Sequence, residues 1–249
     1  MRRASLLTDS KLLIVNNPNN PTGVPIPTSV LDQIVEIARA RHITILSDEV
    51  YRPLFQNLFD GESDAPPSMS VFDYDRIIVT GSMSKAYALA GIRTGWIACR
   101  DKNIVKTITG ARDYTTISVS QLDDQVATFA LSKSVLPALL RRNVELARVN
   151  LQLLSEFVAR HESVCSWVQP TAGTTAFIRF EKNGQPIDDL QFCIDVINET
   201  KVFMVPGSRC FGNGQDFAGY VRIGYVCHTD ILREALERLG AFVGKNLAK

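Results

Sequence analysis

The feature that most constrains the fold of this chain is a series of apolar runs, each of which ends in an unusual polar loop. The first run, LLIV, leads directly into NNPNNPTG at 16–23. Two later runs end in SDEVY at 47–51 and in GSMSK at 81–85. Apolar runs without polar alternation are typical of parallel strands that are buried on both faces. The first half of the chain therefore predicts an α/β fold with a parallel sheet.

Hydrophobic periodicity predicts the remaining elements, and the second half reads as α+β. Strands are expected at 11–17, 43–49, 76–82, 93–99, 174–180, 202–207 and 220–226. Helices are expected at 28–42, 119–131, 134–160, 188–199 and 229–244, the first of them capped by Thr28 or Ser29. The long helix after 134 is expected to join a large domain over residues 1–130 to a smaller C-terminal domain over 131–249.

Composition excludes several classes of function. The 249 residues carry a net charge of +1, which offers no electrostatic footprint for nucleic acid or for an anionic membrane. The five cysteines are scattered, odd in number and contain no CxxC pair. That usage favours reduced thiols and a cytoplasmic location, with no metal site expected.

The three polar loops all follow strands of the expected sheet. Taken singly, each side chain has an ordinary reading: Asp48 as a strand-end carboxylate in water, Lys85 as a solvated amine and Arg93 as a surface arginine. Taken together, these side chains favour a shared site over three separate surface positions. The carboxyl ends of parallel strands lie at one edge of the sheet, and ligands of such sheets bind there. The pattern predicts a binding site at that edge.

Four motifs occur in a specific order: NNPNNPTG, SDEVY, SMSKAYALAGIRTGW and the late VRIGY. Together they resemble the class I/II aminotransferases, fold-type I enzymes that use pyridoxal 5′-phosphate (PLP). The resemblance runs from about residue 10 to the C-terminus. It implies an incomplete, mostly parallel sheet from the PLP-binding large domain over 1–130, followed by the small domain over 131–249.

The resemblance also implies roles for the residues around the cofactor ring. Lys85 would hold PLP as a Schiff base and move a proton at the substrate Cα once substrate displaces it. Such an amine must be partly neutral, which burial and nearby cations favour. Asp48 would pair with the pyridine nitrogen. Tyr51 and Asn20 would bond the phenolic oxygen of the ring.

Four further residues complete the implied site. Arg93, Ser82 and Ser84 would hold the phosphate through charge-assisted hydrogen bonds. Arg222, on the strand YVRIG, would bind the α-carboxylate of the substrate as a planar fork, with Asn20 close to that carboxylate.

The implied function is the transfer of an amino group between an amino acid and a 2-oxo acid in amino acid metabolism, in a homodimer or in a dimer with a full-length paralogue. Other PLP chemistry, such as a lyase or ring-forming synthase reaction, remains an alternative. A third reading starts from the long N-terminal part that family members carry before the NPxNPTG strand. If this chain lacks that part, it is expected to be a truncated, non-catalytic remnant or a subunit that needs a partner chain.

Overall fold

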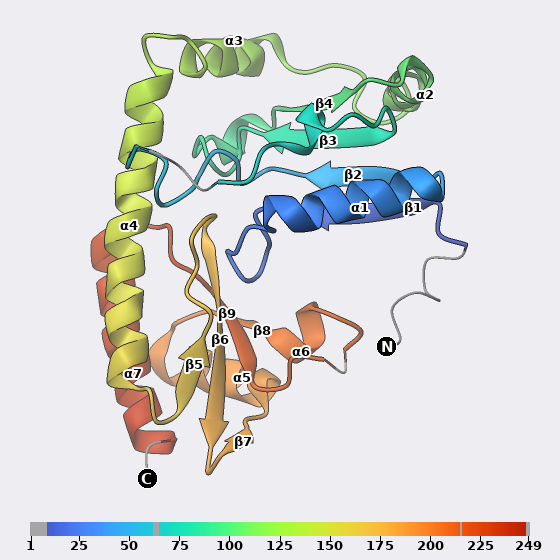
Figure 1. Cartoon of the computed structure of the whole chain (residues 1–249). Helices are drawn as coiled ribbons and strands as arrows, with labels where there is room; N and C mark the ends of the chain where they lie inside the picture. The colour runs from blue at the N-terminus through green and yellow to red at the C-terminus, as the bar shows by residue number, and fades with distance from the viewer. Residues whose placement is uncertain (1–8, 62–64, 215, 248–249) are drawn as a thin grey trace. The chain divides into compact units, whose positions relative to one another are not determined.

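The computed structural model contains two compact units, and its elements are shown in Figure 1. The structure describes residues 9–61, 65–214 and 216–247. The first unit consists of Pro25–Asn143 and the described residues up to Asn19, and the second of Asn20–Val24 and the described residues from Val144 onward. The domain limits expected from the sequence, 1–130 and 131–249, stay a prediction.

The first unit is built on a four-stranded sheet with the order β1-β2-β3-β4. Its strands are β1 (Leu12–Asn16), β2 (Thr44–Asp48), β3 (Ile77–Ser82) and β4 (Gly95–Cys99). The first three pair in parallel, which confirms the predicted α/β fold with a mostly parallel sheet. The register places Asn16 beside Asp48 and Asp48 beside Thr80, so β1 and β2 end at the same level and β3 continues from there to Ser82.

The fourth strand differs from the expected parallel arrangement. β4 runs antiparallel to β3, with Ser82 opposite Gly95. A parallel connection needs a crossover of a dozen or more residues, usually through a helix. The segment between β3 and β4 contains only a short 3₁₀ helix, Ala90–Ile92, and therefore returns the chain in the opposite direction.

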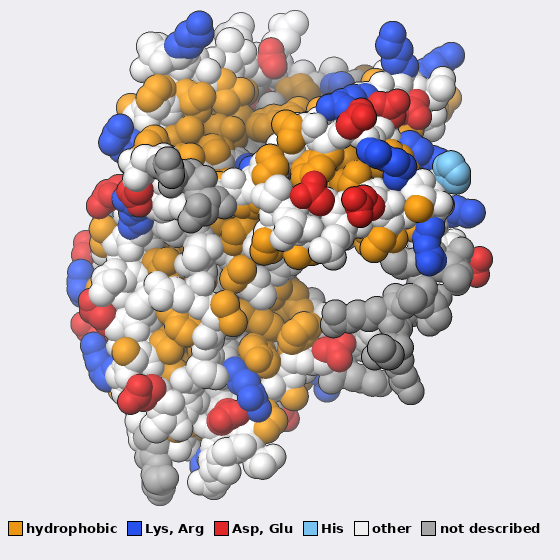
Figure 2. Space-filling view, viewed as in Figure 1, with side chains coloured by type: hydrophobic (Ala, Val, Ile, Leu, Met, Phe, Trp, Pro, Cys, Tyr) orange, Lys and Arg blue, Asp and Glu red, His pale blue; other side chains and the backbone are white. Residues whose placement is uncertain are grey.

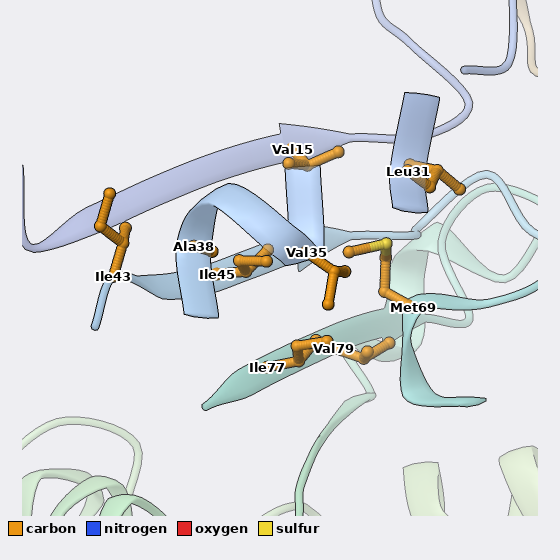
Figure 3. Close-up of a cluster of buried hydrophobic side chains, with 9 residues drawn as sticks. All are labelled: Val15, Leu31, Val35, Ala38, Ile43, Ile45, Met69, Ile77 and Val79. Carbon is orange, nitrogen blue, oxygen red and sulfur yellow. The ribbon is translucent and has the colours of Figure 1, made fainter. Parts of the chain in front are cut away.

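One face of this sheet is covered by α1 (Thr28–Ala40) and by a 3₁₀ helix, Met69–Val71. Helical spacing aligns the inward side chains of α1, and they pack on the strands as Figure 3 shows. The buried cluster consists of Val15, Leu31, Val35, Ala38, Ile43, Ile45, Met69, Ile77 and Val79. Burying each of the larger side chains contributes about 1.5–3 kcal/mol.

Two details of the first unit contradict the sequence analysis. The N-cap position of α1 is Pro27, and no side-chain cap bond forms, so neither Thr28 nor Ser29 caps the helix. Proline is tolerated at a helix start because its missing N–H would have no intrahelical partner there. On β1, Leu12 is 50% and Ile14 64% exposed. The expectation that both faces of the sheet are covered is therefore wrong for this strand.

The rest of the first unit is largely helical. The sequence analysis missed α2 (Lys102–Arg112), whereas α3 (Gln121–Ala130) and α4 (Leu136–Arg160) lie where helices were expected. The first unit contains α4 only as far as Asn143, and the rest of this helix belongs to the second unit. No side chain of α2 is buried. Hydrophobic side chains reach the surface elsewhere in this unit too, among them Trp96 and Phe129, and Figure 2 shows such side chains on one face of the molecule.

The second unit contains an antiparallel sheet with the order β5-β6-β9-β8, and β7 pairs with β6. The strands are β5 (Cys165–Trp167), β6 (Thr175–Lys182), β7 (Gln185–Pro186), β8 (Val205–Pro206) and β9 (Tyr220–Gly224). The strand expected at 202–207 is thus reduced to β8, and the short helix α6 (Gly207–Cys210) follows it.

Strand alternation gives the second sheet two different faces. Ile178 and Val221 are register partners and fully buried, so they belong to the core. That core includes α5 (Asp189–Thr200) and α7 (Thr229–Asn246). Phe192 of α5 packs between the sheet and α7. The centroid of its ring lies 4.9 Å from that of Phe180 on β6 and 5.7 Å from that of Phe242 on α7. The other face carries Arg222.

No helix within the described residues is long and apolar enough to cross a membrane.

Exchanging Gly81 for alanine is expected to destabilise the first unit. A Cβ at this position would overlap the indole of Trp96, which packs edge-on against Tyr87. Forcing extra volume into packed structure costs about 1–3 kcal/mol. Urea unfolding should show this loss. The control is Gly110→Ala, at a site with nothing within 4 Å of the added atom, where alanine in a helix should stabilise by about 1 kcal/mol. Equal stability of Gly81→Ala and the parent chain would contradict the packing described for Trp96.

Candidate active site

Asp48 lies at the carboxyl end of β2, between β1 and β3. One carboxylate oxygen accepts hydrogen bonds from the main-chain N–H of Val50 (3.3 Å) and the hydroxyl of Thr80 (3.5 Å). The other accepts from the side-chain amide of Asn16 (3.3 Å). All of these partners are neutral donors, which orient the carboxylate without neutralising its charge. Asp48 is therefore placed to accept a further hydrogen bond from a cationic N–H group.

The turn after β2 is held by an ion pair between buried Glu49 and partly buried Arg52, which the sequence analysis missed. Glu49 is 6% exposed and accepts from the main-chain N–H of Met69 at 2.7 Å and from the Ser47 hydroxyl at 3.1 Å. Its other oxygen lies 3.3 Å from Nε of Arg52. Burial lowers the pKa of the Arg52 guanidinium, and the charge of Glu49 partly opposes that shift. The pair stabilises the turn that carries Tyr51, whose side chain is buried.

The loop after β3 brings hydroxyl groups and a guanidinium together. The Ser82 hydroxyl donates to Ser84 Oγ at 2.9 Å, and the Ser84 main-chain N–H donates to Ser82 Oγ at 3.1 Å. Arg93 Nη1 approaches Ser84 Oγ at 3.4 Å and donates to the Ala90 carbonyl at 2.8 Å. Arg93 has a φ of 51°, which turns the chain from the short 3₁₀ helix back into β4. Guanidinium, hydroxyl and amide donors of this kind suit a phosphate group.

Lys85 follows these serines directly. Its side chain is exposed, whereas burial was expected to favour its neutral form. The residues around it are firmly packed, since Met83 and Ala86 are fully buried. The amine therefore extends from a fixed backbone into solvent, where a ligand can reach it.

A cavity of about 1020 Å³ also belongs to the first unit. It is lined by β4, by α2 and by the segment before α3, and Arg93 forms part of its wall. Trp96 and Ile97 contribute apolar surface to it and are 41% and 53% exposed.

The second unit holds the other two residues of the expected site. Nη1 of Arg222 donates to the side-chain oxygen of Asn20 at 3.1 Å, and the guanidinium carbon lies 5.6 Å from the ring centroid of Phe211. Arg222 is the register partner of Phe177, so both side chains lie on the same face of the sheet. The amide and the aromatic ring orient the guanidinium fork, which can bind a carboxylate through two parallel hydrogen bonds.

The asparagine- and proline-rich loop is divided between the two units. Asn17 is buried in the first unit and accepts from the main-chain N–H of Ile26 at 2.8 Å. Gly23 belongs to the second unit, where its carbonyl accepts from the N–H groups of Thr171 (3.1 Å) and Ala172 (2.9 Å). Gly23 has a φ of 68°, and a Cβ there would lie 2.6 Å from the Thr175 carbonyl, so only glycine fits.

The loop between β8 and β9 is anchored by a carboxylate that sequence reasoning also missed. Asp189, on α5, is 2% exposed. Its oxygens accept from the N–H and hydroxyl of Ser208, both at 2.9 Å, and from the N–H of Gly219 at 3.1 Å. The bonds fix both ends of the segment that carries Phe211. An acid at a helix start was the only sequence signal, and it is common to many helices.

The structure thus brings the expected site residues together in two groups. The first unit contains Asp48, Tyr51, Ser82, Ser84, Lys85 and Arg93, and the second contains Asn20 and Arg222. The first group fits PLP by its chemistry: an amine for the aldehyde, a carboxylate for the ring nitrogen and a cluster of donors for the phosphate. The individual roles of these residues stay predictions.

Comparison with known proteins places these motifs in a family. The model of the family described as aminotransferase class I and II matches residues 3–239. Capreomycidine synthase of Streptomyces vinaceus is 30% identical over 242 residues, which cover 97% of this chain and 58% of that protein.

Solved structures agree with the match. A PLP-dependent aminotransferase from Streptococcus suis 89-1591 has a TM-score of 0.81 and 34% identity, and the similarity covers 96% of this chain and 58% of that one. A PLP-dependent cyclase has a TM-score of 0.80 and 26% identity, with coverage of 97% and 61%. The chain spans less than two thirds of the length of these relatives.

Replacing Asp189 by alanine is expected to destabilise the second unit, because buried donors on Ser208 and Gly219 would lose their acceptor. Each unsatisfied group costs about 1–3 kcal/mol. The measurement is the free energy of unfolding in urea. Asp195→Ala serves as the control, since the hydrogen bond that the described part of the structure shows for this α5 carboxylate comes from an exposed glutamine, Gln191, and its loss should cost no more than about 0.5 kcal/mol. Equal effects of the two substitutions would refute the anchoring role of Asp189.

Proposed function

Because the chain belongs to the aminotransferase class I and II family, we propose that the complete protein uses PLP, attached to Lys85, to transfer an amino group between an amino acid and a 2-oxo acid. The observation that carries this proposal is the composition of the first unit's site. A reachable amine, an oriented carboxylate and a cluster of phosphate-type donors all follow the carboxyl ends of neighbouring strands. The PLP-dependent enzymes among the similar structures support it.

Lys85 supplies the reactive nitrogen in this proposal. PLP, when bound, offers an aldehyde that condenses with amines and a ring that accepts electron density from the substrate Cα. Nζ of Lys85 first provides the covalent attachment and afterwards, as a free amine, takes a proton from the substrate Cα and returns one to the product. Its exposure allows the side chain to move between these tasks.

Asp48 keeps the protonated ring nitrogen in place. Its carboxylate is oriented by neutral donors, which leaves the contact with a cationic N–H open. A carboxylate paired with a cationic N–H favours the charged form of both groups. Loss of that charge would weaken the electron-accepting character that the reaction needs.

Arg93, Ser82 and Ser84 bind the phosphate. Charge-assisted hydrogen bonds from a guanidinium contribute more than neutral ones, and the hydroxyls can rotate to donate to an anion. The left-handed backbone of Arg93 sets the direction from which the guanidinium approaches.

Arg222 and Asn20 recognise the substrate. The guanidinium fork binds the α-carboxylate that amino acids and 2-oxo acids share, and Asn20 holds one edge of the fork. This assignment predicts a preference for carboxylate-bearing substrates and leaves the side chain of the substrate open.

Ring closure on an amino acid is the second candidate function. It is supported by the similarity to a PLP-dependent cyclase at 26% identity. The two reactions differ in their products: transamination removes the amino nitrogen of the amino acid and releases a 2-oxo acid, whereas cyclisation gives a ring-closed product that retains this nitrogen. Product analysis with a panel of amino acids distinguishes them.

Attachment of PLP to Lys85 is the first expectation. Adding PLP to the purified chain should produce the visible absorption band of lysine-bound cofactor. Borohydride reduction followed by peptide mass spectrometry should locate the label on Lys85. Lys85→Ala should abolish band and label, whereas Lys106→Ala, at an exposed lysine of α2, should leave both unchanged. A label confined to other lysines would contradict the proposal.

Arg222→Gln tests carboxylate recognition. Loss of hydrogen bonds to a charged group costs about 1.5–3 kcal/mol, so the Kd for a 2-oxo acid should rise roughly tenfold to a hundredfold. Titration of the PLP-loaded chain measures this, and attachment at Lys85 should not change. Arg179→Gln is the matched control, because this β6 guanidinium is paired with Glu181 at 2.7 Å. An unchanged Kd for Arg222→Gln would reject the assignment.

A further inference from the structure

A buried asparagine on α4 contacts the backbone next to Lys85. Asn143 is 4% exposed, and its side-chain amide donates to the main-chain carbonyl of Ala86 at 2.9 Å. Its side-chain oxygen accepts from Nη1 of Arg142 at 3.3 Å. Both polar atoms of the amide are therefore engaged, and the contact joins residues that are 57 positions apart in the sequence.

The carbonyl that Asn143 binds belongs to a tight turn. The Ala88 N–H donates to the Lys85 carbonyl at 3.0 Å, and the Leu89 N–H donates to the Met83 carbonyl at 2.9 Å. Ala86 is fully buried, so its carbonyl cannot turn to solvent for a replacement donor. A buried carbonyl without a partner costs about as much as a lost hydrogen bond. The amide of Asn143 is the donor that the structure describes for it.

The same helix carries a second buried asparagine that serves as an internal reference. Asn150 is fully buried and donates to the carbonyls of Tyr225 and Cys227, both at 2.7 Å. It belongs to the second unit, whereas Asn143, Ala86 and Lys85 belong to the first. The two asparagines match in residue type, helix and burial, and the side-chain amide of each donates to main-chain carbonyls. They differ in the turn that they hold and in detail, since Asn150 donates to two carbonyls and its side-chain oxygen has no hydrogen-bond partner among the described residues.

We propose that Asn143 is a positioning residue for Lys85. By holding the Ala86 carbonyl, it fixes the backbone from which the Lys85 side chain extends, so that the amine stays within reach of the cofactor when it is covalently attached and when it is released. A fixed backbone at Lys85 lowers the entropic cost of forming and re-forming the covalent bond between its amine and the cofactor. The inference rests on the proposed role of Lys85.

The test compares Asn143→Asp with Asn150→Asp. Aspartate keeps the size of the side chain but removes the N–H groups, so each variant loses its bonds to main-chain carbonyls. The readout is the equilibrium constant for PLP attachment at Lys85, measured by titration with PLP, reduction and peptide mass spectrometry, with the free energy of unfolding measured in parallel. Asn143→Leu and Asn150→Leu, which also lack a donor, replace either aspartate variant that does not fold.

Both positions should lose stability, but only the Asn143 variants should lower the attachment constant at Lys85, by about tenfold, as expected for one lost hydrogen bond. The rate of Lys85 acetylation by acetic anhydride across pH, relative to Lys106, provides a second readout without cofactor. It should change in the Asn143 variants alone.

The outcomes separate the two proposals. If the parent chain attaches PLP at Lys85 and the two asparagine positions affect attachment and acetylation equally, Asn143 has a merely structural role and the inference is wrong, while the proposed function stands. If the parent chain attaches no PLP at Lys85, the proposed function fails and the inference fails with it.

Discussion

The register of the first three strands is the constraint on which the rest of the candidate site depends. Parallel pairing aligns Asn16, Asp48 and Thr80 at one edge, and side chains from two of these strands then orient the Asp48 carboxylate. A shift of one residue would turn each inward side chain of a strand to the opposite face. The hydrophobic cluster under α1 prevents such a shift, because Val15, Ile45 and Val79 must all stay in the core. Apolar packing on one face thus sets the chemistry at the strand ends.

Around this framework, buried polar groups hold the loops that carry the reactive side chains. Glu49 fixes the turn before Tyr51, Asn143 the turn at Lys85, and Asp189 the segment before Arg222. In each case a side-chain group binds main-chain donors or acceptors far away in the sequence. Main-chain contacts of this kind place a loop without depending on the identity of its side chains. The turn at Lys85 can therefore keep its amine exposed and still hold its backbone in one conformation.

Sequence reasoning predicted the parts of the fold that local pattern determines. Apolar runs located β1, β2 and β3 to within a residue or so, because a buried parallel strand needs no polar alternation. The helix α2 was missed, since its threonines and its glycine have low intrinsic helix propensity. Asp101, which caps α2 by accepting from the N–H groups of Asn103 and Ile104, was the signal that could have revealed it.

The candidate site was predictable only in part for a related reason. Motifs name the residues that touch a ligand, whereas the residues that support them are defined by distance in the folded chain. Asn143 looks like any other asparagine within a helix, and its contact with Ala86 exists only after α4 has packed. The direction of β4 was missed in the same way, because it depends on the short connection after Lys85 and not on the apolar content of the strand.

The divided loop at the end of β1 has a consequence for evolution. Surface loops usually accept insertions and deletions because their ends are anchored and their middle is free. Here Asn17 is held by the first unit and Gly23 by the second, and between them Asn20 binds Arg222. Any change in length would pull at least one of these three residues away from its partner. Homologues of this chain are therefore expected to keep the length of the loop, whereas the identity of its unanchored residues can vary.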